Sequence, residues 1–275
     1  MTPIVIVVVI AALCGIGLTL AAKFMSVPVD ETAAAIRAEL PGANCGACGF
    51  AGCDEYAEKL SGGGVKANLC IPGGDSVGLK ISKVLGVDFE DVVEMYAVVR
   101  CSGTCEHTTY VMDYQGPKTC EGCNFFFQGR GTCSHACLGY GDCVSKCQYG
   151  ALCIENGIAV VDPLLCTGCG MCVSSCPNHL ITVIPQTSKI FVGCASTDKG
   201  AFTRKLCSAG CIGCKRCEKA CEHGAIVIEN NLARIDPDKC VNCGKCIGVC
   251  PTKVVHTVCV SDGSVLAPAA AEKSA

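Results

Sequence analysis

Two runs of closely spaced cysteines near the C-terminus carry the clearest chemical signal in this chain. Both follow the spacing C-x2-C-x2-C-x3-C, and a proline follows the second run. The eight positions are Cys211, Cys214, Cys217, Cys221, Cys240, Cys243, Cys246 and Cys250. Iron–sulfur clusters select thiolate ligands, and this spacing lets one loop hold three corners of a cubane. The fourth cysteine of each run reaches the other cluster. The pattern therefore predicts two [4Fe–4S] clusters.

Crossing the fourth ligands divides these cysteines between the two clusters. One cluster is expected on Cys211, Cys214, Cys217 and Cys250. The other is expected on Cys221, Cys240, Cys243 and Cys246. The double run is similar to that of the bacterial two-cluster ferredoxins.

A second pair of runs lies earlier in the chain. Its first run is stretched, Cys133-x3-Cys137-x5-Cys143-x3-Cys147, and its second is Cys166-x2-Cys169-x2-Cys172-x3-Cys176-Pro177. The same crossing predicts one cluster on Cys133, Cys137, Cys143 and Cys176, and another on Cys147, Cys166, Cys169 and Cys172. Within each pair, turn residues at 155–157 and 229–231 separate apolar segments, which predicts a β-hairpin. Cys166 and Cys240 are 74 residues apart, and so are Cys147 and Cys221, which indicates an internal duplication.

A fifth cluster is expected near the N-terminus. Its ligands would be Cys45, Cys48, Cys53 and Cys70, and the glycines between the first three let the backbone curl around a cluster. Four more cysteines lie outside any ferredoxin pattern: Cys101, Cys105, Cys120 and Cys123. They form either a sixth metal site or a set of buried thiols. The remaining thiols are expected to pack rather than to bind metal: Cys14, Cys153, Cys194, Cys207 and Cys259.

The composition agrees with a metal-binding protein. Cysteine accounts for 29 of the 275 residues, a share that indicates either a disulfide scaffold or metal binding. The recurring CxxC spacing favours metal over disulfides, which need an oxidising compartment. Zinc also binds CxxC pairs, but a tetrahedral zinc site has no use for three adjacent ligands plus a remote fourth. The net charge of −3 gives no indication of nucleic-acid binding.

The elements that must position these cysteines begin with an apolar N-terminus. Ile4 to Ala22 are nineteen consecutive uncharged, mainly apolar residues, the length of a single membrane-spanning helix. A signal peptide is the alternative, but no positively charged segment precedes the apolar run. Lys23 on its C-terminal flank favours a cytoplasmic position for the remainder of the chain. Asp30 to Leu40 is expected to form a short helix, and Ile81 to Val99 a helical and loop connection.

Together these features predict an α+β fold with a single N-terminal transmembrane helix, a small helical 4Fe-4S domain and two tandem two-cluster ferredoxin-like modules. The expected segments are the anchor (1–23), a linker with a short helix (24–43), the N-terminal 4Fe-4S domain (44–80), a connecting region with extra cysteines (81–132), module 1 (133–185), a connector (186–206), module 2 (207–258) and a flexible tail (259–275).

Four motifs give the chain a resemblance to a known family. They are Asn44-Cys-Gly-Ala-Cys-Gly-Phe-Ala-Gly-Cys53, Arg100-Cys-Ser-Gly103, Cys137-Leu-Gly-Tyr-Gly-Asp-Cys143 and Gly210-Cys-Ile-Gly-Cys214. The chain resembles the B subunits of Rnf complexes, membrane-bound ferredoxin:NAD oxidoreductases that translocate sodium ions or protons. This resemblance implies an electron-transfer subunit at the inner cell membrane. It would accept electrons from soluble reduced ferredoxin and relay them through five or six [4Fe–4S] clusters to the other Rnf subunits. Ion translocation and NAD⁺ reduction would occur in those subunits.

The sequence offers no catalytic site of its own. No glycine-rich dinucleotide fingerprint follows a strand, and no P-loop is present. Two alternatives to the Rnf interpretation remain open. One is an electron-input iron–sulfur subunit of a hydrogenase or formate dehydrogenase complex, and the other is a zinc-structured membrane adaptor.

Overall fold

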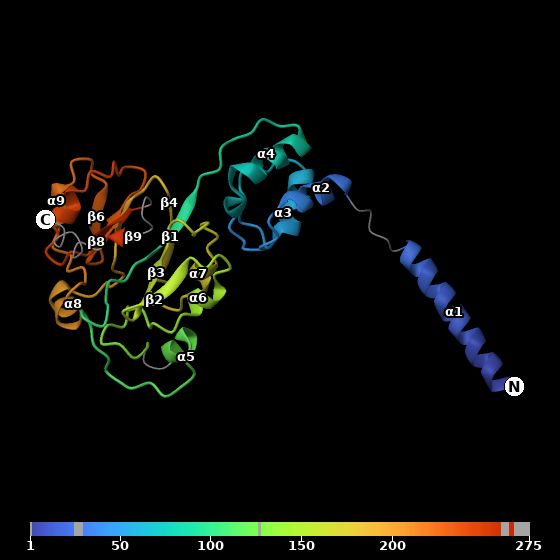
Figure 1. Ribbon diagram of the computed structural model, residues 1–275, viewed down its shortest axis with the longest axis horizontal. Coiled ribbons are helices and arrows are strands. Elements are labelled where there is room, and N and C mark those ends of the chain that lie inside the picture. The colour runs from blue at the N-terminus through green and yellow to red at the C-terminus, as the bar shows by residue number, and fades with distance from the viewer. Residues whose placement is uncertain (1, 25–29, 126–127, 260–263, 267–275) are drawn as a thin grey trace.

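The computed structural model of the protein describes residues 2–24, 30–125, 128–259 and 264–266. An N-terminal helix, a helical domain and a larger part with two similar α+β units follow one another along the chain (Figure 1). The mixture of short helices and short strands confirms the α+β class. The predicted tail from residue 259 lies almost entirely outside the described residues.

The apolar N-terminus forms helix α1 (Thr2–Phe24), as predicted. It extends away from the other elements in Figure 1. Its described side chains are exposed, including those of Leu13 and Leu18. Among the residues that the structure describes, however, no helix is long and apolar enough to cross a membrane. The structure thus supports the predicted helix but not its predicted transmembrane character.

The helical domain is built from α2 (Glu31–Glu39), α3 (Cys53–Ser61), a 3-10 turn (Ile71–Gly73) and α4 (Gly74–Leu85). Asp30 begins α2 as predicted, because its carboxylate accepts the N–H of Thr32 at 2.9 Å. The three helices pack around four fully buried side chains, Ile36, Tyr56, Leu60 and Ile81. This small core positions the first four candidate ligands.

Each of the two α+β units contains one hairpin and two short helices. In the first unit the hairpin joins β2 (Leu152–Glu155) and β3 (Ile158–Val161), and the helices are α6 (Asp142–Lys146) and α7 (Met171–Ser175). In the second unit the hairpin joins β6 (Ile226–Glu229) and β7 (Leu232–Ile235), and the helices are α9 (Arg216–Ala220) and α10 (Lys245–Gly248).

Both predicted hairpins are confirmed as antiparallel pairs. Their turns contain residues with positive φ, such as Asn156 at 47° and Asn230 at 47°. Asparagine and glycine tolerate this conformation better than other residues, which explains the turn sequences. The internal duplication read from the cysteines is therefore also a duplication of secondary structure.

A strand from the connecting region joins the two units. The sequence predicted a helix and loop over 81–99, but the last five residues form β1 (Met95–Val99), which pairs antiparallel with β4 (Ile181–Pro185). The correction has a tertiary cause, because β1 gains its hydrogen bonds from a segment far along the chain. Tyr96 donates its hydroxyl hydrogen to the Ser188 carbonyl at 2.5 Å and packs with Phe191 and Val258.

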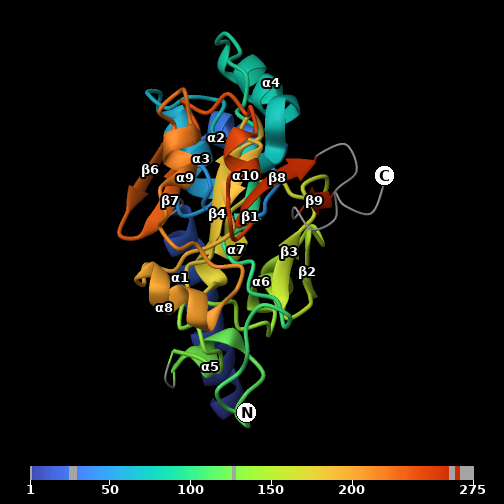
Figure 2. The ribbon, with the colours of Figure 1, turned by 90° about the vertical axis from the view of Figure 1, so that its left-hand side faces the viewer.

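The second unit also pairs with a strand that follows the first. There β5 (Ile190–Val192), β8 (Val255–Cys259) and β9 (Ser264–Leu266) form a small antiparallel sheet, and α8 (Gly200–Leu206) follows β5. The last helix, α5 (Cys120–Phe125), lies beside the first unit (Figure 2). The units are therefore linked through strands at their shared side.

Candidate iron–sulfur sites

Four of the predicted ligands in the second unit surround one cavity. Its lining includes Cys211, Cys214, Cys217 and Cys250, and it encloses about 320 Å³ of empty space. The loop after Cys211 can follow this course because Gly213 has φ +61°, and a Cβ there would lie 2.8 Å from the Asn231 carbonyl oxygen. Only glycine fits this close approach between loop and hairpin. The structure thus brings together the four residues that the motif placed on one cluster.

The second set in this unit is Cys221, Cys240, Cys243 and Cys246. Electrostatic contact with the other three acts on the Cys246 thiol, so all four lie near one another. The backbone N–H of Ala225 donates to the Cys221 sulfur at 3.3 Å. Such N–H···S contacts favour the charged thiolate that a metal requires.

A cavity of similar size lies in the first unit. Cys147, Cys166, Cys169 and Cys172 line it, and it encloses about 290 Å³. Two backbone amides point at sulfurs here: Ala97 of β1 donates to Cys166 at 3.3 Å, and Ala151 donates to Cys147 at 3.4 Å. Strand β1 therefore contributes to this site as well as to the packing between units.

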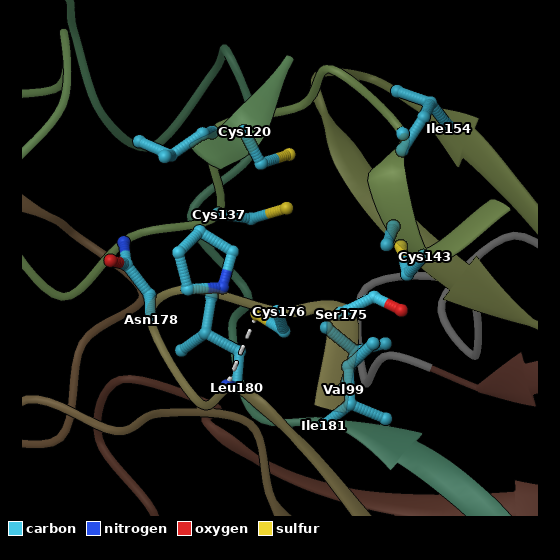
Figure 3. A pocket seen from close by; sticks show the side chains of 14 residues that line it. Val99, Cys120, Cys137, Cys143, Ile154, Ser175, Cys176, Asn178, Leu180 and Ile181 are labelled. Carbon is cyan, nitrogen blue, oxygen red and sulfur yellow. Dashed lines mark hydrogen bonds between the residues drawn. The ribbon is translucent and has the colours of Figure 1, made fainter. Parts of the chain in front are cut away.

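The remaining cavity of the first unit departs from the predicted ligand set. Three of the expected cysteines line it, Cys137, Cys143 and Cys176, in a space of about 380 Å³. The fourth cysteine is Cys120 of α5, whose sulfur lies beside that of Cys137 in Figure 3. Cys133, which the sequence placed here, lines a different cavity.

The duplication explains why Cys120 is found at this cavity. A shift of 74 residues places Tyr140 on Cys214. The loop that begins at Cys137 is therefore of standard length rather than stretched, and it lacks its middle cysteine. Cys120 lies at the cavity from another part of the chain. The sequence interpretation missed this residue, although the repeat alignment contained the signal.

Asp142 holds the Cys120 segment in place. Its two carboxylate oxygens accept the backbone N–H groups of Cys120 at 2.9 Å and of Glu121 at 3.0 Å. Because Asp142 is also the first residue of α6, it ties α5 to the helix that carries Cys143. A charged acceptor gives stronger hydrogen bonds than a neutral one.

An arginine further supports this loop. The guanidinium of Arg130 lies over the rings of Tyr110 and Tyr140, at 4.2 and 4.5 Å from their centroids, and donates to the Leu138 carbonyl at 3.3 Å. Cation–π contacts of this kind contribute about 0.5–1 kcal/mol at exposed sites. They fix Tyr140 in the position where the second unit has a cysteine.

The N-terminal quartet is also brought together. Electrostatic contacts from Cys45, Cys48 and Cys53 all act on the Cys70 thiol. Asn44, at φ 47°, accepts the Cys53 N–H on its side-chain oxygen at 2.8 Å, which closes the loop over the start of α3. The helical core therefore presents four thiols from one short stretch of chain.

The four cysteines of the suggested sixth site are not brought together. Cys120 lies at the cavity described above, while Cys101 lines another one. Cys123 is buried against Leu138, and Cys105 is exposed. Within the described part of the chain, no group of three or more His, Cys, Asp or Glu side chains is arranged to hold a single metal ion.

The cavities and thiols fit iron–sulfur clusters. Each cavity offers space for a group of several atoms between cysteines. Burial raises the pKa of Cys143 to about 12 and of Cys172 to about 11. A thiol in such surroundings ionises only when a cation offsets the desolvation of the thiolate, as a coordinating metal does.

Three family models match parts of the chain. Residues 40–72 match a model of an Fe-S cluster family, residues 159–182 a 4Fe-4S binding domain, and residues 210–254 a 4Fe-4S dicluster domain. These ranges coincide with the N-terminal quartet, part of the first unit and most of the second.

Curated relatives match over nearly the whole chain. The B subunit of the Na⁺-translocating ferredoxin:NAD⁺ oxidoreductase complex of Acetobacterium woodii is 39% identical over 93% of this chain and 77% of its own length. The B subunit of the ion-translocating oxidoreductase complex of Methanosarcina acetivorans is 40% identical over 90% of this chain and 96% of its own length. The B subunit of the proton-translocating ferredoxin:NAD⁺ oxidoreductase complex of Clostridium ljungdahlii is 37% identical over 93% and 91%.

The chain belongs to the B subunits of ion-translocating oxidoreductase complexes. The resemblance to the Rnf B-subunit family is thereby confirmed, as is the presence of iron–sulfur and ferredoxin-type domains. In this member of the family, the duplicated units are the parts that match ferredoxin-type domain models.

The contact between Asp142 and α5 gives a testable prediction. Replacing Asp142 with alanine leaves two backbone N–H groups without their acceptor, which costs about 1–3 kcal/mol where such groups are buried. We expect Asp142→Ala to lower the unfolding midpoint of the anaerobic protein and to lose iron faster under chelator challenge. Asp142→Asn, which keeps one acceptor oxygen, should lie in between. Asp88→Ala in an exposed loop is the control, and equal behaviour of Asp142→Ala and Asp88→Ala would contradict the assigned role.

Proposed function

We propose that this protein is the electron-transfer subunit of a membrane-associated Rnf-type complex. It accepts electrons from reduced ferredoxin and relays them through [4Fe–4S] clusters to the other subunits, where NAD⁺ is reduced and Na⁺ or H⁺ is translocated. The observation that carries the proposal is the arrangement of cysteines around three cavities in two ferredoxin-like units. The membership in the B-subunit family agrees with it.

We propose five ligand sets that follow the geometry. Four sets are those that the sequence motifs indicated, and the first unit takes Cys120 in place of Cys133. The sets are Cys45, Cys48, Cys53 and Cys70; Cys120, Cys137, Cys143 and Cys176; Cys147, Cys166, Cys169 and Cys172; Cys211, Cys214, Cys217 and Cys250; and Cys221, Cys240, Cys243 and Cys246.

The clusters supply one-electron redox chemistry, and the protein sets their potentials. Hydrogen bonds to the sulfurs and the degree of burial are among its means. Backbone amides such as that of Leu180, which donates to the Cys176 sulfur at 3.4 Å, stabilise negative charge and thereby raise the potential. Burial in apolar surroundings acts in the opposite direction, because it penalises the additional charge of the reduced cluster. Ferredoxin oxidation requires potentials near the low end of the range, at about −400 mV.

Electron acceptance is the experiment that tests this function. The full chain, purified without oxygen, is mixed with reduced bacterial two-cluster ferredoxin, and its visible charge-transfer absorption is followed. We expect rapid bleaching of that absorption, and no bleaching by NADH because the proposed NAD site lies elsewhere in the complex. Iron–sulfur clusters that NADH reduced but ferredoxin did not would contradict the proposal. A colourless, zinc-containing protein would contradict it at a more basic level.

The ligand role proposed for Cys120 is tested with a neighbouring cysteine as control. Cys120 and Cys123 lie on the same short helix and are both buried. We expect Cys120→Ala to lower the iron content by about four atoms per chain, since a cubane needs its fourth ligand. Cys123→Ala should retain all the iron. An undiminished iron content in Cys120→Ala would refute the proposed set.

We further propose that α1 attaches the protein to the inner membrane as an N-terminal anchor, with the cluster-bearing part on the cytoplasmic side. Large apolar side chains such as Ile10, Leu13 and Leu18 are exposed on this helix, and burial in lipid would remove them from water. Deleting residues 1–23 should release a protein that still contains its clusters. After cell fractionation, persistence of the truncated chain in membranes that lack the other subunits would contradict this proposal.

A further inference from the structure

A cavity between the two units is lined by four cysteines that none of the five sets uses. They are Cys101, Cys133, Cys194 and Cys207. Each comes from a different segment of the chain, so no local motif links them. All four are free thiols, and Cys194 and Cys207 are buried. The cavity encloses about 350 Å³, between the values found at the other cysteine-lined cavities.

The sulfurs converge on this space. A Cβ placed on Gly103 would lie 3.6 Å from the sulfur of Cys101 and 3.6 Å from that of Cys207, so these two sulfurs are close to each other. Electrostatic contacts from Cys194 and Cys207 both act on Cys133. The four thiols therefore form one group rather than two separate pairs.

Their backbone surroundings match those of the ferredoxin-type ligands. Each sulfur faces the backbone N–H two residues further along the chain, in Gly103, His135, Ser196 and Ala209. The same relation holds for Cys166 with Gly168 and for Cys211 with Gly213. Amides directed at sulfur are a recurring device for stabilising cluster ligands. A thiol that only fills space in a core needs no such arrangement.

The duplication gives independent support. The shift of 74 residues that relates the two units places Cys133 on Cys207. Both residues precede the first cysteine of their unit by four positions, and the structure brings both to this one cavity. Equivalent positions of the two repeats thus meet at a shared site, and Cys101 and Cys194 complete it.

We propose that Cys101, Cys133, Cys194 and Cys207 ligate a sixth [4Fe–4S] cluster. Binding releases the four thiol protons to solvent, and each sulfur becomes a thiolate ligand to one iron. This site deepens the proposed electron-transfer function and rests on it for its purpose, although its metal content is testable without it. Arg100 and His135 also line the cavity and supply basic groups beside the anionic ligands.

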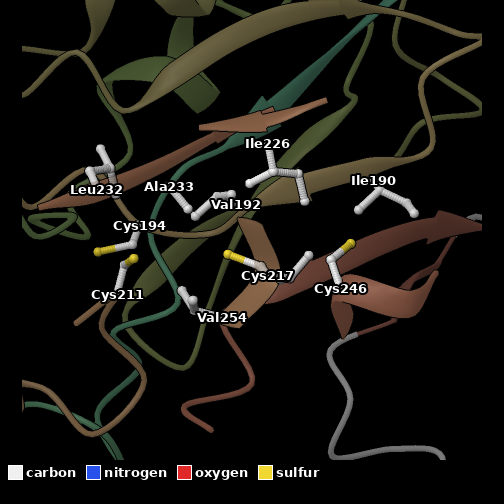
Figure 4. Packing of buried hydrophobic residues seen from close by; sticks show 11 residues of the cluster. Ile190, Val192, Cys194, Cys211, Cys217, Ile226, Leu232, Ala233, Cys246 and Val254 are labelled. Atoms are coloured by element: carbon white, nitrogen blue, oxygen red, sulfur yellow. The ribbon is translucent and has the colours of Figure 1, made fainter. Parts of the chain in front are cut away.

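The position of this site gives it a role in the relay. On one side, the backbone N–H of Cys137 donates to the Cys101 sulfur at 3.3 Å, and Cys137 is a proposed ligand in the first unit. On the other side, Cys194 packs in the same buried cluster as Cys211, and their sulfurs are neighbours in Figure 4. The sixth cluster therefore lies between a cluster of the first unit and a cluster of the second, and connects them.

Metal analysis of the full chain, purified without oxygen, is the first test. Six cubanes predict about 24 iron atoms and as many sulfides per chain, whereas five predict about 20. A value near 24 supports the sixth cluster, and a value near 20 overturns it even if ferredoxin still reduces the protein. Twenty irons accompanied by one zinc would also overturn it, in favour of a zinc site. A chain without iron would instead overturn the proposed function itself.

Single variants then assign the site. Cys194→Ala and Cys207→Ala should each lose about four irons relative to the wild type, with the remaining clusters still reduced by ferredoxin. Cys153→Ala, at an exposed position of β2, is the matched control and should lose none. Retention of all iron in both cavity variants overturns the assignment. If the alanine variants do not accumulate, Cys207→Ser and the wild-type iron count provide the same decision.

Discussion

The need to stabilise buried thiolates dominates this structure. In the two ferredoxin-like units the helices have only four or five residues and the hairpin strands four, which is too short for independent stability. Their cores consist largely of cysteines together with small aliphatic side chains. Where metal binding and folding are coupled, the free energy of ligation becomes free energy of folding. The fold of these units therefore follows from where the cysteines must converge.

The packing between the units depends on the same constraint. Strand β1 comes from the connecting region, yet its Ala97 amide is directed at a sulfur of the first unit, while Tyr96 packs against elements of the second. A single strand thus serves the environment of one cluster and the contact between repeats. Burial of Tyr96, which raises the pKa of its phenol to about 12, keeps this side chain neutral in the interface.

Local patterns in the sequence predicted the hairpins, helix α2 and two cysteine sets that line cavities, because spacing and turn residues encode these features directly. The strand β1 could not be predicted from its own residues, since its hydrogen-bond partners lie in β4. Cys120 escaped prediction for the same reason: only the tertiary structure places α5 beside Cys137. The position of Cys133 was accessible, because aligning the repeats places it on Cys207, outside the ferredoxin run. The apparent stretching of the first run concealed this alignment.

The interleaving of cysteines from distant segments has a consequence for biosynthesis. The N-terminal quartet is complete within about 26 residues, so this domain has all its ligands soon after it leaves the ribosome. In contrast, the cavity of Cys211 is closed only by Cys250, near the end of the chain. Because N-terminal domains fold first during synthesis, cofactor delivery to the N-terminal domain can precede completion of the polypeptide. Delivery to the second unit has to wait for nearly the entire chain, which leaves its cysteines exposed to solvent for the intervening time.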